Sequence, residues 1–195
     1  MDLAVTKSNL KGEILIPGSK SHTIRAIAIA AMANGKTTIN NPLISSDTLS
    51  AADTYRALGA KIDICSPDHW IINGTNAKIS APNEPIDVGN SGTTLRLAIA
   101  SAALAEPQYS VTLTGDAQIQ TRPVDELIKA VNNLGAKAAS INDNGSAPVK
   151  ITGKLRGGKT DLKCLTSQYL SGLLLAAPLA DTPEQAANLR ARAEL

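Results

Sequence analysis

Two kinds of helix are predicted from the apolar positions along the chain. In the first kind, apolar residues recur at three- and four-residue intervals, which places them on one helical face. This pattern begins at Ser46 or Asp47 and ends at Gly59, and it occurs again from Pro123 to Gly135. We expect each stretch to form an amphipathic helix that the glycine terminates.

The second kind of helix is apolar around nearly its whole circumference. Such stretches begin at Ser21, Ser91 and Ser167 and consist mainly of Ala, Ile and Leu. A helix without a polar face has to be covered on all sides, so we expect all three helices to be buried. Each is shorter than the roughly 20 apolar residues that cross a bilayer, so we expect no association with a membrane.

An internal repeat organises these elements. The tetrapeptide Leu-Gly-Ala-Lys occurs at 58–61 and again at 134–137, and the apolar helices start at similar intervals. Short segments with the residue pattern of β-strands lie between the helices. We expect strands at 12–16, 60–65, 70–73, 110–114, 136–141 and 147–152. The predicted fold class is α/β, an inside-out repeat domain in which buried helices are surrounded by sheets and outer helices. Two repeats are complete, and the third ends after its apolar helix.

Composition and charge exclude several classes of function. Apolar residues make up 43% of the chain and charged residues 18%, which is typical of a folded domain. Aromatic residues make up only 2% and the net charge is +2, so no nucleic-acid partner is expected. Cys65, Cys164, His22 and His69 have no metal-ligand or disulfide spacing. Since the first residues lack a signal-peptide pattern, we expect a cytoplasmic protein.

The starts of the three apolar helices carry hydroxyl groups, small residues and nearby cations. Backbone N–H groups and the positive end of the helix dipole attract anions at such positions. Lys20 and Arg25 belong to the first start, Arg96 to the second, and Thr166-Ser167-Gln168 opens the third. Taken singly, each hydroxyl is most simply an N-cap. Three such starts in repeat register, with cations beside them, predict one pocket for a substrate that bears phosphate and carboxylate groups.

Two further sequence features carry less weight. The phosphate-binding loop of nucleoside triphosphatases requires glycine directly before lysine, and here Ser19 separates Gly18 from Lys20, so that class is excluded. Arg122 stands just before the second amphipathic helix and, taken alone, is expected to be solvated.

Four motifs together resemble those of the 5-enolpyruvylshikimate-3-phosphate synthases. They are GSKSHTIRA at 18–26, GNSGTTLRL at 89–97, TRPVDELIKAVNNLGA at 121–136 and TSQYLSGLLLAAPLA at 166–180. Their order and spacing are those of the family, and the resemblance covers roughly residues 5–180. This family, the target of glyphosate, transfers the enolpyruvyl group of phosphoenolpyruvate to the 5-hydroxyl of shikimate 3-phosphate and releases phosphate. The resemblance implies this step of aromatic amino acid biosynthesis, without a metal or cofactor.

The resemblance assigns one group of residues to phosphoenolpyruvate. Lys20 would contact both substrates, and Arg122 would pair with the anionic groups of phosphoenolpyruvate. Gly92 would lie against this substrate, where a Cβ would crowd it, while Asn90 belongs to the same motif and Arg96 supports it. Charged groups that are already in place stabilise a charged intermediate, so Lys20 and Arg122 are the candidate catalytic residues.

A second group of residues is assigned to shikimate 3-phosphate by the same resemblance. Ser21 and Arg25 would hold the carboxylate side of the substrate. Thr166 and Ser167 would hold its phosphate, and Gln168 would pack by the ring. Thr166 stands where many members of the family have serine, and the hydroxyl donor is retained.

A sister family, the UDP-N-acetylglucosamine enolpyruvyl transferases, shares the fold and is the alternative. Its members have a Lys-Asn pair where this chain has Lys20-Ser21, and they usually carry a cysteine shortly before the Arg-Pro-Val-Asp string. Here that stretch is Gly115-Asp116-Ala117-Gln118, without cysteine. Both differences favour the shikimate enzyme.

The resemblance also implies a domain organisation. Members of the family are more than twice as long and have two domains of three repeats, with the active site between them. Residues 1–16 would be a strand segment of the other domain, 17–180 the shikimate-3-phosphate-binding domain, and 181–195 a polar, helix-prone tail that departs from the family pattern. Two hypotheses follow. The chain is half of an enzyme that a complementing C-terminal polypeptide completes, or it is a fragment that binds substrate without turning it over.

Overall fold

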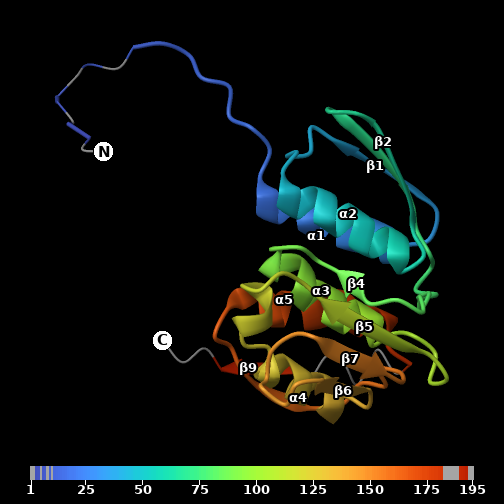
Figure 1. Cartoon of the computed structure of the whole chain (residues 1–195). Coiled ribbons are helices and arrows are strands. Elements are labelled where there is room, and N and C mark those ends of the chain that lie inside the picture. Colours follow the sequence, from blue (N-terminus) through green and yellow to red (C-terminus); the bar gives the residue numbers. More distant parts are fainter. Residues whose placement is uncertain (1–2, 5, 8, 10, 182–188, 193–195) are drawn as a thin grey trace.

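The computed structural model describes residues 3–4, 6–7, 9, 11–181 and 189–192 (Figure 1). Its helices are α1 Lys20–Met32, α2 Ser46–Ala57, α3 Gly92–Ala102, α4 Asp125–Asn133 and α5 Ser167–Ala176. Its strands are β1 Lys36–Asn40, β2 Lys61–Ser66, β3 His69–Asn73, β4 Ile86–Asp87, β5 Ser110–Thr114, β6 Lys137–Ser140, β7 Val149–Thr152, β8 Thr160–Lys163 and β9 Leu189–Arg192. Two 3-10 turns complete the elements, η1 Ile119–Thr121 and η2 Ala177–Leu179.

The elements form two similar units and part of a third, as the repeat predicts. In the first unit, α1 and α2 pack together beside the antiparallel sheet β1-β3-β2 (Figure 1). In the second unit, α3 and α4 accompany the sheet β4-β5-β7-β6, in which only the β4–β5 pair is parallel. The third unit consists of α5 and the parallel pair β8–β9. The predicted inside-out α/β class is confirmed.

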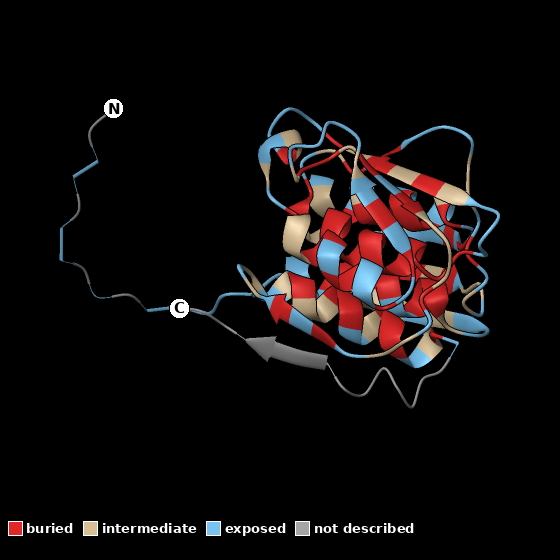
Figure 2. Cartoon of the chain, turned by 90° about the horizontal axis from the view of Figure 1, so that it is seen from below, coloured by how far each residue is buried: buried red, intermediate tan, exposed pale blue. Residues whose placement is uncertain are grey.

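The central helix of the domain is α3, and among the apolar helices it alone is buried on all sides. Every residue of α3 except Thr93 is buried, and the helix packs against α1, α2 and α5. Figure 2 shows that buried residues are concentrated in the interior of the domain. The prediction of complete burial was wrong for α1 and α5. These helices flank α3 and keep one face that no described residue covers, so Ile29 and Leu174 are each 52% exposed.

The starts of the two amphipathic helices differ slightly from the prediction. The N-cap of α2 is Ser45, whose hydroxyl accepts a hydrogen bond from the backbone N–H of Thr48 in a capping box. The backbone of Val124 is not helical, so α4 begins at Asp125. Pro123 therefore precedes α4 and does not occupy its first turn.

The predicted strand at 12–16 is not formed, whereas the other five predicted strands correspond to β2, β3, β5, β6 and β7. Residues 12–16 lead away from the body of the molecule (Figure 1). A strand is stabilised by a hydrogen-bonded neighbour, and no described strand provides one here. Ile14, Leu15 and Ile16 are consequently 81%, 95% and 74% exposed.

The tail predicted at 181–195 contains a strand, although its composition favoured a helix. Within the described residues, β9 pairs in parallel with β8, so that Leu189 lies opposite Thr160. Residues 182–188 and 193–195 lie outside the part that the structure describes. None of the described helices is both long and apolar enough to cross a membrane.

Candidate functional site

A polar pocket of about 210 Å³ lies where the first turns of α1, α3 and α5 converge. Each of these helices contributes a residue of its first two positions, since Lys20, Gly92 and Gln168 all line the pocket. The complete lining is Lys20, Asp47, Asn90, Ser91, Gly92, Thr93, Arg96, Arg122 and Gln168. Segments that are far apart in the sequence are thus brought to one place, as the repeat register predicts.

The hydroxyl groups at the three helix starts are N-caps. The side chains of Ser19, Ser91 and Thr166 accept hydrogen bonds from backbone N–H groups of α1, α3 and α5, respectively. Each cap satisfies one of the four N–H groups that a helix start leaves unpaired, while the positive end of the dipole still faces the pocket. Capping and anion attraction therefore coexist at these positions.

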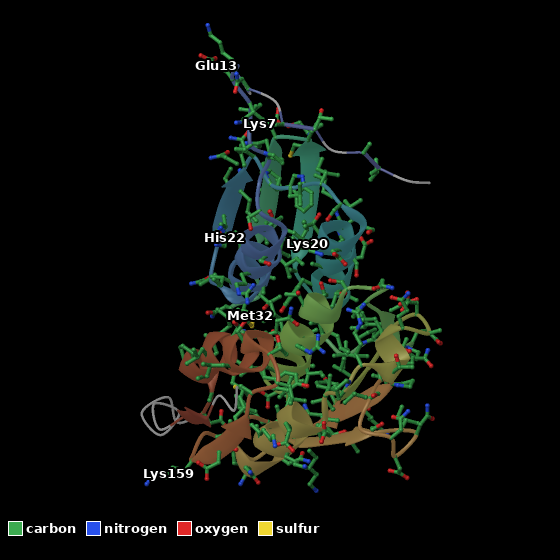
Figure 3. The ribbon with its side chains drawn as sticks, turned by 90° about the vertical axis from the view of Figure 1, so that its left-hand side faces the viewer. Lys7, Glu13, Lys20, His22, Met32 and Lys159 are labelled. Atoms are coloured by element: carbon green, nitrogen blue, oxygen red, sulfur yellow. The ribbon has the colours of Figure 1, made fainter. Side chains whose placement is uncertain are left out.

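Two cations at the pocket have polar partners. The ammonium group of Lys20 lies 2.5 Å from Oδ2 of Asp47, which belongs to α2. Arg122, which follows η1, donates from NH2 to Oδ1 of Asn90 at 2.9 Å. In Figure 3, Lys20 and His22 are labelled beside the first helices of the upper unit. Since Asp47 is the single carboxylate in the lining against three cations, the pocket carries an excess of positive charge.

The third cation, Arg96, is buried and has no carboxylate partner among the described ion pairs. Its NH1 donates to the carbonyl of Gly92 at 3.1 Å and to Oε1 of Gln168 at 2.9 Å. The guanidinium lies 5.5 Å from the ring centroid of Tyr169. Its Nε has no hydrogen-bond partner in the described part of the chain. A buried cation without a counter-ion strengthens the attraction of the pocket for anions.

The Gln168 side chain ties α5 to α3 across the pocket. Its Oε1 accepts from Arg96, and its Nε2 donates to Oγ1 of Thr93 at 2.9 Å. The Tyr169 hydroxyl donates to the carbonyl of Pro123 at 2.6 Å, which links α5 to the segment that carries Arg122. Burial raises the pKa of Tyr169, and the nearby charge of Arg96 opposes part of that rise.

Four of the predicted site residues do not line this pocket: Ser21, Arg25, Thr166 and Ser167. They gather on the neighbouring side of the same helix starts. Arg25 donates from NH1 to the carbonyl of Ser21 and from NH2 to Oγ of Ser171 at 3.0 Å, which connects α1 to α5. The Ser171 hydroxyl in turn donates to the carbonyl of Ser167. The predicted residues thus form two adjacent groups, one in the pocket and one along the α1–α5 contact.

Several residues at the site were not among those predicted from sequence: Ser91 and Thr93 in the lining, and Asp47, Asp116 and Tyr169. Asp47 was expected only as a possible cap of α2, yet it is the partner of Lys20. Asp116 lies before η1 and bonds to Asn90. The sequence around each of these residues gives no signal of a partner that is distant along the chain, so only the folded chain identifies the contacts.

A larger hollow of about 750 Å³ lies elsewhere, and none of the predicted site residues lines it. Its charged residues are Lys78, Glu106, Lys154 and Asp181. Lys154 already pairs with both Glu106 and Asp181, so these charges largely cancel. In the described residues, no three His, Cys, Asp or Glu side chains are grouped as metal ligands. The smaller pocket, with its helix starts and excess of cations, is the better anion site.

Replacing Gly92 by alanine is expected to displace both neighbouring guanidinium groups. A Cβ at this position would lie 2.7 Å from NH1 of Arg96 and 2.8 Å from NH1 of Arg122. Since both are ends of flexible side chains, the fold should persist, while the affinity for inorganic phosphate falls about fivefold, or about 1 kcal/mol. Calorimetric titration of the chain with phosphate measures this change. Gly35→Ala is the control, because Gly35 does not line the pocket and a Cβ there meets no atom within 4 Å; unchanged affinity in Gly92→Ala contradicts the prediction.

Residues 5–192 match the family model described as EPSP synthase (3-phosphoshikimate 1-carboxyvinyltransferase). The chain is 50% identical to the 3-phosphoshikimate 1-carboxyvinyltransferase of Acetivibrio thermocellus over 179 residues, covering 92% of this chain and 42% of that protein. It is 45% identical to the same-named protein of Methanothermobacter thermautotrophicus, covering 94% of this chain and 43% of the relative.

A solved structure agrees with these sequence relatives. An EPSP synthase from Acinetobacter baumannii superposes with a TM-score of 0.79 at 31% identity, covering 87% of this chain and 38% of that one. The chain spans about two fifths of the length of the curated relatives it matches.

Proposed function

Because this chain belongs to the EPSP synthase family, we propose that it supplies the shikimate-3-phosphate-binding half of a 3-phosphoshikimate 1-carboxyvinyltransferase. The main support is the pocket in which three helix starts and the cations Lys20, Arg96 and Arg122 converge. Helix starts and cations attract phosphate and carboxylate groups, and both substrates of this reaction carry them.

The reaction requires that negative charge be stabilised while two substrates combine. The 5-hydroxyl oxygen of shikimate 3-phosphate bonds to C2 of phosphoenolpyruvate, as the hydroxyl loses its proton and C3 gains one. The tetrahedral intermediate then breaks the C2–O bond to phosphate and loses a proton from C3, which leaves the enol ether and inorganic phosphate. In this proposal Lys20 and Arg122 face the phosphate oxygens, and Lys20 exchanges Asp47 for substrate.

The residues along the α1–α5 contact are proposed to bind shikimate 3-phosphate. Ser21 and Arg25 would hold its carboxylate side, and Thr166 and Ser167 its phosphate. The hydrogen bond from Arg25 to Ser171, one turn after Ser167, supports this arrangement because it fixes the distance between the two helix starts. Gln168, Asn90 and Gly92 would complete the contacts on the pocket side.

We propose residues 17–180 as the substrate-binding domain and 1–16 as a strand that pairs with a second domain. The exposed apolar side chains of Ile14, Leu15 and Ile16 support this assignment, since a strand with such side chains needs a partner sheet. Catalysis then requires the remainder of the family architecture, in this polypeptide or in a complementing one. Both described cysteines are free thiols, which supports a reducing, cytoplasmic location.

Calorimetric titration with shikimate 3-phosphate tests the proposed function. The 195-residue chain should bind this ligand, and Lys20→Ala and Ser167→Ala should each weaken binding about tenfold, or about 1.4 kcal/mol. Each substitution removes a donor that the proposal places on the ligand. Lys7→Ala is the matched control, because this exposed lysine precedes the folded domain (Figure 3). Equal affinity in all four proteins, or no binding by the wild type, overturns the proposal.

An assay of phosphate release separates the two hypotheses about catalysis. With both substrates present, the isolated chain should release no phosphate above background, because the active site of the family lies between two domains and the chain is proposed to supply one of them. Adding the complementary C-terminal part of a relative should restore turnover if the chain is half of a two-part enzyme. Turnover by the isolated chain contradicts the expectation that catalytic groups are missing.

A further inference from the structure

The side-chain amide of Asn90 lies between a carboxylate and a guanidinium at the edge of the pocket. Its Nδ2 donates to Oδ2 of Asp116 at 2.6 Å and to Oε1 of Gln118 at 2.9 Å. Its Oδ1 accepts from NH2 of Arg122 at 2.9 Å. Three segments of the chain, before α3, before η1 and after η1, are therefore joined through one amide.

The chemistry of the two outer groups allows only one orientation of this amide. An ionised carboxylate only accepts hydrogen bonds, and a guanidinium only donates them. Asn90 must therefore turn its NH₂ group to Asp116 and its oxygen to Arg122. Asp116 therefore fixes the orientation of the Asn90 amide, and this orientation presents the amide oxygen to Arg122 as a hydrogen-bond acceptor.

Asp116 is itself held in place by the turn that it opens. Its Oδ1 accepts from the backbone N–H of Ile119 at 2.9 Å, which leaves Oδ2 for Asn90. Its backbone N–H donates to the carbonyl of Gly89 at 3.0 Å. The backbone N–H of Ile119, the amide of Asn90 and the charge of Arg122 lower the pKa of Asp116, so the carboxylate stays ionised near neutral pH.

We propose that Asp116 is a positioning residue for Arg122, which it orients through Asn90 toward the anion in the pocket. Asn90 engages NH2 of Arg122, while NH1 stays beside Gly92, only 2.8 Å from the position of a Cβ on that glycine. The guanidinium is thereby aimed at the space that the glycine leaves open. This inference rests on the proposed function for the identity of the anion, phosphoenolpyruvate, but the positioning itself depends only on hydrogen bonds within the chain.

Replacing Asp116 by asparagine tests the proposal with little change of shape. The new amide oxygen can still accept from Ile119, but its NH₂ group then faces the NH₂ group of Asn90. If Asn90 turns over to relieve this conflict, it presents NH₂ to Arg122 and the acceptor is lost. We expect the Nη–H resonances of Arg122 in a ¹H–¹⁵N spectrum to shift and to exchange faster with water, because Nη2 donates the bond to Asn90. Affinity for phosphoenolpyruvate, with shikimate 3-phosphate saturating, should fall about fivefold.

Asp87→Asn is the matched control. It removes the same charge from the neighbouring strand β4, where Oδ1 of Asp87 accepts from the backbone N–H of Gly89. An asparagine oxygen can keep that bond, and Asp87 makes no hydrogen bond to Asn90 among the described contacts. The Arg122 resonance should therefore match the wild type in this variant.

A second variant breaks the link while leaving the turn at Asp116 intact. Asn90→Ala should change the shift and the exchange rate of the Arg122 resonances as much as Asp116→Asn does. The double variant should show no further change, because both residues act along one path. An Arg122 resonance that Asp116→Asn leaves unchanged, or effects of the two substitutions that add, overturns the proposal. If Arg122 is released but the wild type binds neither substrate, the positioning role is supported and the proposed function fails.

Discussion

Replacing Gly74 by alanine is expected to lower the free energy of unfolding by about 3 kcal/mol, through overpacking against backbone atoms. A Cβ on Gly74 would overlap the backbone oxygens of Ala33 and Ala30, neither of which can move without distorting the end of α1. For a chain of this length the melting temperature should fall by roughly 6 to 12 °C, which calorimetry or circular dichroism measures.

The close approach at Gly74 exists because the turn after β3 caps the end of α1. The backbone N–H groups of Thr75, Asn76 and Ala77 donate to the carbonyls of Ala31, Ala33 and Met32, respectively, at 2.8 to 2.9 Å. A helix end leaves four carbonyls unpaired, and this turn satisfies three of them. The rigidity of the helix that carries Lys20 and Arg25 therefore depends on a glycine at its opposite end.

Gly35→Ala is the control for the Gly74 prediction. The carbonyl of Gly35 accepts from the N–H of Gly74, so the two glycines lie side by side at the same end of the β1–β3 pair. A Cβ on Gly35 meets no atom within 4 Å, and its only cost is the positive φ of 90°, about 1 kcal/mol. Equal losses of stability in the two variants contradict the assigned steric cause.

Replacing Arg96 by methionine is expected to weaken the binding of phosphoenolpyruvate about 30-fold, or about 2 kcal/mol, with shikimate 3-phosphate saturating. Methionine fills similar space but removes the buried charge and the hydrogen bonds to Gly92 and Gln168. The lost attraction between this cation and the anionic ligand sets the magnitude, since a hydrogen bond to a charged group contributes about 1.5 to 3 kcal/mol. Titration calorimetry measures the affinity.

Stability should change much less than affinity in the Arg96 variant. The guanidinium is buried without a carboxylate and with its Nε unpaired among the described residues, so replacing it by an apolar side chain removes a desolvation cost. Arg56→Met is the control, because Arg56 donates to the carbonyl of Ile62 and to Asp53 on α2 and does not line the pocket. Retained affinity in a folded Arg96→Met chain contradicts the role of this charge.

Much of the secondary structure could be predicted because it depends on neighbours along the chain. The two amphipathic helices, α2 and α4, are followed two residues after their last helical residue by Gly59 and Gly135, whose φ angles of 110° and 102° favour glycine. Among the correctly predicted strands, β2, β3, β5 and β7 have alternating or β-branched residues. The segment 12–16 has the same local pattern but no described partner, and it forms no strand. Local pattern alone does not supply the neighbour that a strand requires.

The candidate site was predicted only in part, for a related reason. The cations and hydroxyl groups at the helix starts were evident from motifs, but their convergence is a property of the packed domain. The bond from Arg96 to Gln168 joins residues 72 positions apart, and that from Asn90 to Asp116 joins residues 26 positions apart. The periodicity of apolar residues within one helix or strand carries no information about such distant pairs.

The sequence by itself determined the helix types, the repeat and the residues able to bind anions, because these follow from local hydrogen bonding and side-chain chemistry. The tertiary structure decided which of these residues share a pocket. It also decided that α3 is the most completely buried of the apolar helices, because α1, α2, α4 and α5 all pack against it. The packing of segments that are distant in the sequence also determined that Arg96 is buried and that hydrogen bonds through Asn90 link Asp116 to Arg122.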